Sequence, residues 1–505
     1  MKRIKYIAIN LLLLSLGACT SFDDINTNPD TPNTVTPAML ATPLIINIES
    51  PIDDKHFVHD NFVSKQLLWG GGVEDYVYNY FGRIDFSKYA SLTNARKMVE
   101  LADKDEKNAY EGLALFIKSY HLFSYTMKVG DIPYSQILEG ENNNLKPVFD
   151  TQEQVLAGIL TDLATSAELF SNASDFAGDP VFKGDVNKWL KTVNAFRLKI
   201  LMALSSKEKV GNINVKETFA ALYKQGHLLE SNADNFCKIF SDKANQKYPF
   251  HYTVSKQANY GIVSSVMVDF LKELKDYRLF YYAEPAKSKI DEGVNPDAWE
   301  AYIGIDPSKT FTYVGTQYTA GEYSGLNRRY SELPACEPYI FVGYAEQNFI
   351  LAEAAIRGWI QSDASSFYSK GIEAAMLFTG DNTSGNDVYN HGRLITDEYI
   401  QSYLGQSSVK LSGNQEHQIS QVIQQKYLAS FMQLPWAAYY DYRRTGYPKL
   451  PINPESNLNS EKDKIPVRWM YPQTEYDFNT ENVEAAVGRQ YNGEDAVNSK
   501  MWILK

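Results

Sequence analysis

The sequence predicts a mostly α-helical protein in which paired helices form a scaffold and one long irregular segment supplies a binding surface. Two observations lead to this fold class. Apolar residues recur at helical spacing over 92–129, 151–170, 186–204, 339–359 and 362–378. In contrast, residues 228–335 interleave proline, glycine and polar residues with many aromatics, and only 261–277 has a helical pattern there.

The helical segments follow in order. Residues 36–66 predict a first helix with Pro37 near its start and Pro51 as an interruption. Thr151 or Asp150 caps the helix over 151–170, which should pair with 92–129 in a hairpin like those of tetratricopeptide repeats. The helix over 186–204 takes a partner at 214–225, and the pair over 339–359 and 362–378 carries small alanines that permit close approach. Shorter helices are expected at 396–404, 416–433 and 436–442.

The first residues predict export. Three basic residues precede a short apolar run, and Leu16-Gly17-Ala18-Cys19 follows it, so residues 1–18 are interpreted as a signal peptide. The apolar run is shorter than the roughly 20 residues that a transmembrane helix needs. A cysteine directly after small residues is typical of bacterial lipoprotein processing, which predicts lipidation of Cys19; an ordinary signal peptide is the alternative. Residues 19–35, rich in Asn, Asp and Pro, then form an extended lipidated tether.

Composition narrows the class of partner. The chain has 505 residues, 44% of them hydrophobic, and a formal net charge of −12. Such a surface repels nucleic acid and anionic lipid, so we expect no nucleic-acid partner. After Cys19 only Cys237 and Cys336 remain, in no metal-ligand spacing. They are either two buried thiols or one disulfide.

The sequence predicts neither an enzyme, a metal site nor a cofactor. Gly-x-Ser-x-Gly, His-Glu-x-x-His, P-loop and dinucleotide fingerprints are all absent from it. His56 and His59 could share a helix face but lack a third ligand. A glycosidase can draw its two carboxylates from distant positions in the sequence. The 61 acidic residues therefore do not exclude an enzyme, but no pattern among them supports one.

Aromatic residues are the main binding candidates. Trp69 precedes three glycines, and Tyr76, Tyr78 and Tyr80 alternate with period two, which would place them on one side of an extended segment ahead of Arg83. Packing of these tyrosines from an edge strand onto the body is the equal alternative. The irregular segment adds Trp299, Tyr302, Tyr313, Tyr318, Tyr323, Asn327 and Arg328. Aromatic faces stack on sugar rings while Asn and Arg bond hydroxyls, so this set suits a glycan, with fewer than half expected to touch it.

Five separated motifs resemble one known family. They are Phe22-Asp-Asp-Ile-Asn-Thr-Asn-Pro29, Val129-Gly-Asp-Ile-Pro-Tyr-Ser-Gln136, the set Trp189, Asn194 and Arg197, and the segments 436–448 and 465–472. Together they resemble the SusD/RagB family, specifically the SusD-like subgroup of nutrient-binding outer-membrane lipoproteins of Bacteroidetes.

The resemblance implies a single domain over 36–505 with four tetratricopeptide-like hairpins and a loop-rich binding half. It also implies a lipid-anchored position on the outer face of the outer membrane. The implied function is non-catalytic capture of oligosaccharide and its delivery to a SusC-like TonB-dependent transporter, over which the protein acts as a lid. The alternatives are a peptide ligand for the same lid and, from another class, a surface glycosidase or peptidase.

Overall fold

The computed structural model describes residues 34–49, 54–140 and 143–505. The predicted signal peptide, Cys19 and almost all of the tether therefore lie outside the described residues. Helices dominate, which confirms the mostly α fold class. The strands of the described residues form three antiparallel pairs: β1 (Leu67–Trp69) with β5 (Gly261–Val263), β2 (Lys209–Val210) with β3 (Ile213–Asn214), and β4 (Phe236–Lys238) with β6 (Tyr339–Val342).

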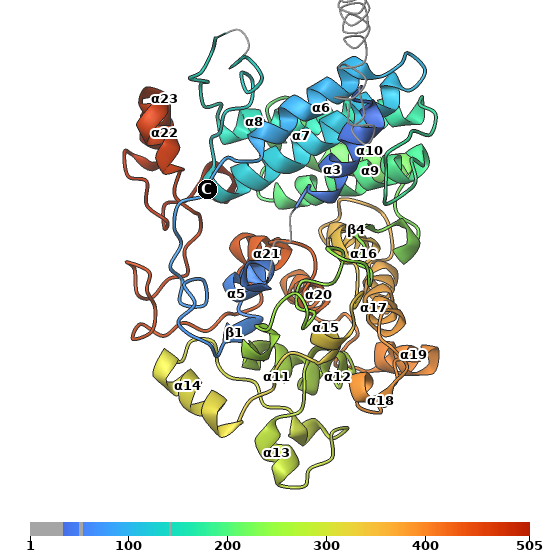
Figure 1. The fold of residues 1–505 in the computed structure, drawn as a ribbon, viewed down its shortest axis with the longest axis vertical. Helices are drawn as coiled ribbons and strands as arrows, with labels where there is room; N and C mark the ends of the chain where they lie inside the picture. The colour runs from blue at the N-terminus through green and yellow to red at the C-terminus, as the bar shows by residue number, and fades with distance from the viewer. Residues whose placement is uncertain (1–33, 50–53, 141–142) are drawn as a thin grey trace, which may run out of the picture.

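The N-terminal helices gather at one end of the long axis (Figure 1). They are α3 (Pro37–Ile46), α6 (Tyr89–Leu101), α7 (Lys107–Val129), α8 (Gln152–Ser171), α9 (Val186–Ala203) and α10 (Val215–Gln225). The Thr36 hydroxyl caps α3 by accepting the Met39 N–H (3.3 Å), and Pro37 occupies the first turn, where a missing N–H costs nothing.

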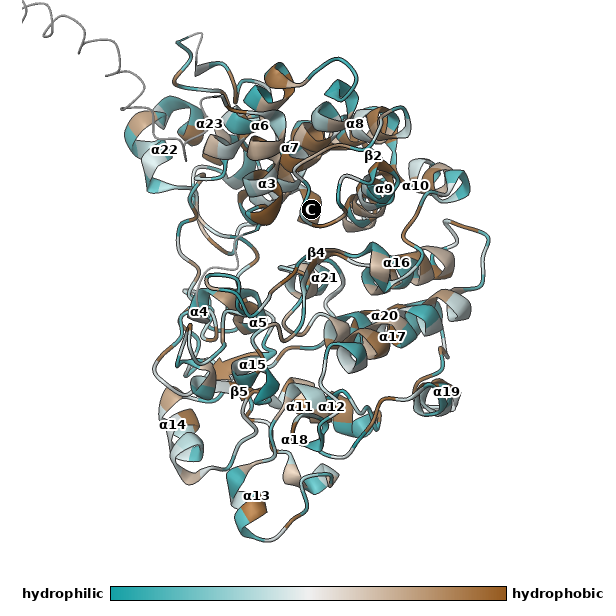
Figure 2. Cartoon of the chain, turned by 45° about the vertical axis from the view of Figure 1, so that its right-hand side comes forward, coloured by the Kyte–Doolittle hydropathy of each residue, from teal (hydrophilic) through white to brown (hydrophobic). Residues whose placement is uncertain are grey.

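The α7/α8 hairpin confirms the predicted antiparallel pair. Thr151 caps α8 through a full capping box with Gln154. A Cβ at Gly112 would lie 3.2 Å from the Phe170 ring, and the Ser166 hydroxyl donates to the Gly112 carbonyl (2.7 Å), so the two helices pack closely. Apolar residues concentrate on α3 and α7 where they face their neighbours (Figure 2).

A second group of helices follows β6. It contains α16 (Tyr344–Ile356), α17 (Ala364–Asp381), α18 (Asp387–Asn390), α19 (Asp397–Gly405), α20 (Gln415–Ala429), α21 (Ala437–Thr445), α22 (Gln473–Phe478), α23 (Thr480–Tyr491) and the 3-10 turn η5 (Trp502–Leu504). The α16/α17 hairpin is as close as predicted, because a Cβ on Gly371 would meet the Phe349 ring at 2.7 Å. One continuous set of buried apolar side chains runs from Ala41 to Ile503.

The remaining elements are short and occupy the far end and the middle of the molecule (Figure 1). They are α4 (Asp54–Phe57), α5 (His59–Val63), η2 (Asn232–Asp234), η3 (Ala258–Tyr260), α11 (Ser265–Glu273), α12 (Leu279–Tyr282), α13 (Lys287–Asp291), η4 (Trp299–Ala301), α14 (Phe311–Ala320) and α15 (Arg329–Glu332). The ten-residue α14 lies in the segment predicted to be irregular, so that prediction was wrong for 311–320.

Four other helix predictions need correction. The helix predicted over 36–66 ends at Ile46 as α3, and in the described part of that range only the short helices α4 and α5 follow it. The region 92–129 is two helices, because Ala102 turns extended (ψ 133°) before a run of charged residues. The predicted helix over 261–277 begins with strand β5, whose Ile262 and Val263 are β-branched, and α11 starts only after the Ser264 cap. Likewise β6 takes the first residues of the helix predicted over 339–359, and Gly343 separates it from α16.

Candidate ligand-binding face

The short sheet β1/β5 brings two aromatic residues together. Its register places Trp69 opposite Gly261, and the Gly70 N–H donates to the Tyr260 carbonyl (2.8 Å). The Trp69 and Tyr260 rings consequently lie 5.7 Å apart. Trp69 is buried, whereas Tyr260 is 39% exposed, so the tyrosine packs on the tryptophan with part of its surface open to solvent.

The glycines after Trp69 are required by this packing. A Cβ on Gly70 would lie 2.3 Å from Tyr318 Cδ2, and one on Gly71 would lie 2.8 Å from Tyr260 Cγ. Real Cβ atoms do not approach that closely. The backbone at 70–71 thus passes directly against two tyrosine rings because it has no side chains.

Helix α14 and the residues after it supply the aromatic side chains that lie next to Tyr260. The Thr310 hydroxyl caps its start, and Gly321 ends it in the left-handed conformation (φ 69°). This reversal stacks Tyr318 on Tyr323, with centroids 5.0 Å apart and planes 26° apart, and Tyr318 lies 6.3 Å from Tyr260. Burial and then the neighbouring Tyr318 raise the pKa of Tyr323, and the Tyr318 hydroxyl donates to the Asn259 carbonyl (3.4 Å).

Four aromatic residues from three distant segments therefore form one group, here named the aromatic cluster: Trp69, Tyr260, Tyr318 and Tyr323. Exposed polar side chains border it, among them Asn259 and Glu322. Flat apolar faces with polar groups at their rim suit a ligand that has both C–H faces and hydroxyl or amide groups.

The tyrosines predicted to share one face do not. Residues 75–79 form turns, so the predicted extended segment was wrong. Buried Lys65 explains the turn, because its ammonium donates to the carbonyls of Tyr76 (3.2 Å) and Val77 and to Asn79 Oδ1 (2.7 Å). Tyr76 is half-buried and its hydroxyl accepts from the Trp469 indole (3.1 Å), Tyr78 is buried, and Tyr80 is 51% exposed.

Arg83 and Trp299 lie in other contacts. Arg83 Nη1 donates to the Tyr471 carbonyl (2.8 Å) and pairs with Asp495 (2.9 Å). Trp299 is half-buried against Phe280, 4.8 Å between centroids, and the Lys275 ammonium lies 5.0 Å from its ring centre. None of these contacts joins Arg83 or Trp299 to the aromatic cluster.

The last predicted residues divide between interior and surface. Tyr302 and Asn327 are 1% exposed and bond carbonyls: the Tyr302 hydroxyl donates to Pro296 (3.0 Å), and the Asn327 amide donates to Phe280 (3.0 Å). Arg328 is half-exposed and pairs with Glu284 (3.3 Å). Tyr313 is 46% exposed on α14. Ligand contact stays a prediction for all twelve. Burial keeps Trp69, Tyr78, Tyr302 and Asn327 from direct contact with a ligand unless the structure rearranges.

Sequence reasoning missed Tyr260 and Asn259, because the apolar run that follows them was read as a helix. The dipeptide Asn259-Tyr260 before Gly261 and two β-branched residues was the available sign of a turn and strand. A separate cavity of about 630 Å³ lies between the end of α3 and the segment after β4. Ile45, Val181, Phe240 and Val254 are among the described residues that line it, and none of the twelve predicted residues is.

No group of three or more His, Cys, Asp or Glu among the described residues could hold a metal ion. No described helix has the length and apolar character needed to span a membrane.

The fold and the candidate site together define a scaffold of helical hairpins, beside which a strand, a 3-10 turn and a short helix present clustered aromatic side chains. A family model, SusD-like, described as starch-binding and associating with the outer membrane, matches residues 29–472. The chain belongs to this SusD-like family.

Solved structures agree with that membership. A SusD homologue from Bacteroides fragilis NCTC 9343 is 49% identical, with a TM-score of 0.91 over 93% of this chain and 100% of the other. A second SusD homologue from that strain is 32% identical, with a TM-score of 0.82 over 94% and 100%. A chitin-binding SusD homologue from Flavobacterium johnsoniae has the same fold, at 19% identity and a TM-score of 0.73 over 93% and 98%. Among curated proteins none matches this chain.

Proposed function

We propose that this protein is a non-catalytic surface lipoprotein that captures oligosaccharide. The observation that carries the proposal is the aromatic cluster, because three sequence-distant segments and two obligatory glycines converge to build it. Its Tyr260, Tyr318 and Tyr323 rings reach the surface beside Asn259 and Glu322. The description of the family as starch-binding, and of one relative as chitin-binding, supports a glycan as the ligand class.

Titration of the soluble protein against a panel of glycans tests this proposal. Tyr318→Ala should weaken binding about tenfold, the loss expected for a central aromatic contact of about 1.4 kcal/mol. Tyr252→Ala is the matched control, because Tyr252 is 61% exposed and its ring contacts His251 and no member of the aromatic cluster. Binding of no glycan, together with peptides that co-purify and are identified by mass spectrometry, would replace the sugar with a peptide ligand.

We further propose that the protein is anchored through Cys19 at the cell surface and acts as the lid of a SusC-like TonB-dependent transporter. The lipoprotein motif supports the anchor, and a family described as associating with the outer membrane supports this location. Affinity purification from detergent-solubilised outer membranes tests the partnership. The expected result is stoichiometric recovery of one large β-barrel transporter; recovery of the lipoprotein alone contradicts the lid role.

A further inference from the structure

The cavity of about 630 Å³ between the end of α3 and the segment after β4 is a second candidate binding site. No member of the aromatic cluster lines it. Its volume falls in the range of about 300–1,000 Å³ that is typical of small-molecule sites. A ligand in this cavity would therefore bind independently of the proposed glycan site.

Apolar side chains supply much of the lining. Ile45, Phe240 and Phe341 are buried there, whereas Ile239 and Val254 are 61% and 51% exposed. Exposed apolar side chains beside a cavity lose contact with water when an apolar ligand enters, which favours binding. No tyrosine or tryptophan is among the described residues that line it, so the cavity suits an apolar chain better than a sugar ring.

The wall formed by Pro180 and Val181 is fixed, and its acid is already satisfied. The Thr42 hydroxyl on α3 donates to the Gly178 carbonyl (2.7 Å), which holds this loop against the helix. The Asp179 carboxylate accepts from the Val181 N–H (2.8 Å) and from the Trp189 indole (2.9 Å). Asp179 is therefore bonded within its own surroundings and does not line the cavity.

Charge gives the cavity a preference for an anion. Two lysines and no acid are among the described residues that line it. Lys247 pairs with Asp242 (3.0 Å). Lys238 is half-buried and forms no ion pair or side-chain hydrogen bond with a described residue.

The neighbouring charges do not neutralise Lys238. Burial and then the nearby Lys88 lower the pKa of Lys238, and no described carboxylate opposes these effects. Burial also lowers the pKa of Lys88, but there the carboxylates of Glu49 and Asp85 oppose it. Lys238 is thus a half-buried cation without a counter-charge, and burying such a charge is costly.

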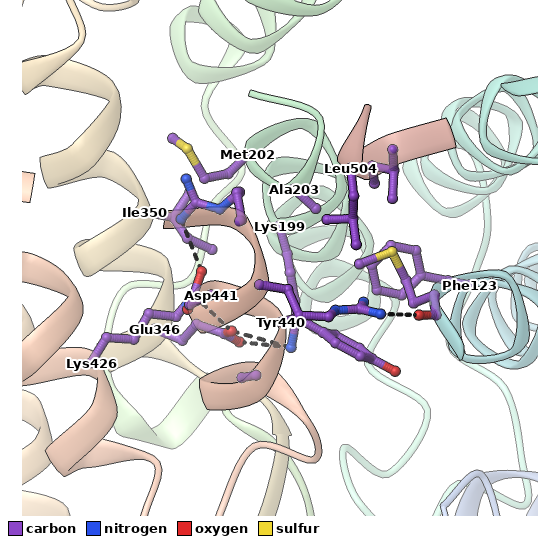
Figure 3. A pocket seen from close by; sticks show the side chains of 15 residues that line it. Phe123, Lys199, Met202, Ala203, Glu346, Ile350, Lys426, Tyr440, Asp441 and Leu504 are labelled. Carbon is purple, nitrogen blue, oxygen red and sulfur yellow. Dashed lines mark hydrogen bonds and ion pairs between the residues drawn. The ribbon is translucent and has the colours of Figure 1, made fainter. Parts of the chain in front are cut away.

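A smaller cavity inside the helical scaffold has the opposite arrangement (Figure 3). Its volume of about 30 Å³ has room for one or two waters. Lys199 and Lys426 line it, and both form ion pairs with Glu346, at 3.2 and 3.3 Å. This cavity therefore lacks both the room and the unpaired lysine of the larger one.

We propose that the larger cavity binds a small monocarboxylate with an apolar chain, of the class of a medium-chain fatty acid. The chain lies against Ile45, Phe240 and Phe341, and the carboxylate pairs with the Lys238 ammonium. One carboxylate supplies the single counter-charge that Lys238 lacks. A neutral chain of the same length would fill the cavity but leave that charge unpaired.

Calorimetric titration of the soluble protein with decanoate and with decanol, both at concentrations where they are monomeric, tests the proposal. Decanoate should bind about tenfold more tightly than decanol, the difference expected for one hydrogen-bonded charge pair. Lys238→Met keeps an apolar side chain and should abolish this preference. Val254→Trp alters a half-exposed side chain, so the variant should fold, and the larger ring should block both ligands.

Lys243→Met is the matched control, because Lys243 is an exposed lysine of the same segment that does not line the cavity. It should keep the preference for decanoate. Tyr318→Ala should also bind decanoate normally, whatever its effect on glycan binding. The proposal is overturned by the absence of saturable decanoate binding, by equal affinities for the two ligands, or by an unchanged preference in Lys238→Met.

A crystal structure with decanoate locates the site. The carboxylate should lie within hydrogen-bond distance of Lys238 Nζ, with the chain inside the cavity. Decanoate bound elsewhere on the protein and not in this cavity would mean an adventitious additive only, and would overturn the proposal too.

Discussion

Gly70→Ala should disturb the aromatic cluster with little effect on the rest of the fold. The new methyl carbon would lie 2.3 Å from Tyr318 Cδ2 and 2.6 Å from Cε2, whereas carbon atoms in contact prefer about 3.5 Å or more. The Tyr318 ring must therefore retreat by roughly 1 Å. Because this ring is half-buried at the surface, the cost in folding free energy should be near the lower end of the overpacking range, about 1 kcal/mol.

The ligand should respond more strongly than the fold. Displacement of Tyr318 breaks its 5.0 Å stack on Tyr323 and moves a central face of the aromatic cluster, so glycan affinity should fall about tenfold. The melting temperature should fall by no more than about 2 °C. Isothermal titration and a thermal melt measure the two effects.

Gly82→Ala is the control, since a Cβ there meets no atom within 4 Å. It should bind like the wild type. A folded Gly70→Ala protein that binds its glycan with unchanged affinity would refute the assignment of the ligand to the aromatic cluster.

Three further predictions concern stability and location. Burial raises the pKa of Asp60 to about 7, so folding takes up a proton and the free energy of unfolding of the wild type falls as pH rises from about 4 to 7. The free energy of unfolding of Asp60→Asn relative to wild type should therefore rise by roughly 2–4 kcal/mol across that window. A difference in denaturant unfolding that does not change with pH would contradict this. Arg329→Met breaks the buried pair with Glu337 (2.5 Å) and should lower the free energy of unfolding by about 3–5 kcal/mol. The control is Arg328→Met, which removes a half-exposed pair with Glu284 and should cost less than about 1 kcal/mol. Equal losses of the two variants in urea unfolding would refute the burial argument. Cys19→Ala should release the protein from the membrane fraction with its ligand affinity intact, and retention there without the transporter would show that the lipoprotein assignment is wrong.

Long periodic segments were predictable because their apolar stripes face one core. The α7/α8 and α16/α17 hairpins and the Thr151 cap lie where the sequence predicted them. The motif arginines Arg443 and Arg444 bond carbonyls and acids within the fold. Short strands were not predictable, because Gly261–Val263 and Tyr339–Val342 are apolar runs joined to helices, and only pairing with a distant strand makes them extended.

The candidate site was predictable in residue type but not in arrangement. Trp69, Tyr318 and Tyr323 were named from composition, yet their meeting depends on the β1/β5 register and on the reversal at Gly321. The spacing of Tyr76, Tyr78 and Tyr80 predicted an extended segment, and this was wrong. Hydrogen bonds from the Lys65 ammonium, and not strand pairing, determine the backbone conformation of 76–79. A single buried cation that collects carbonyl groups leaves no periodic sign in a sequence.

The two cysteines in the described body are free and buried, with 8% and 7% exposure. Cys237 pairs in register with Ile340, whereas Cys336 lies three residues before β6 begins. Burial raises the pKa of Cys237 to about 12 and also raises that of Cys336, so neither is a reactive thiolate near neutral pH. A single cysteine introduced on the surface of the mature domain would then be labelled selectively by maleimide dyes. Paired with a label on a co-purified transporter, it would let fluorescence transfer test whether the protein moves as the proposed lid.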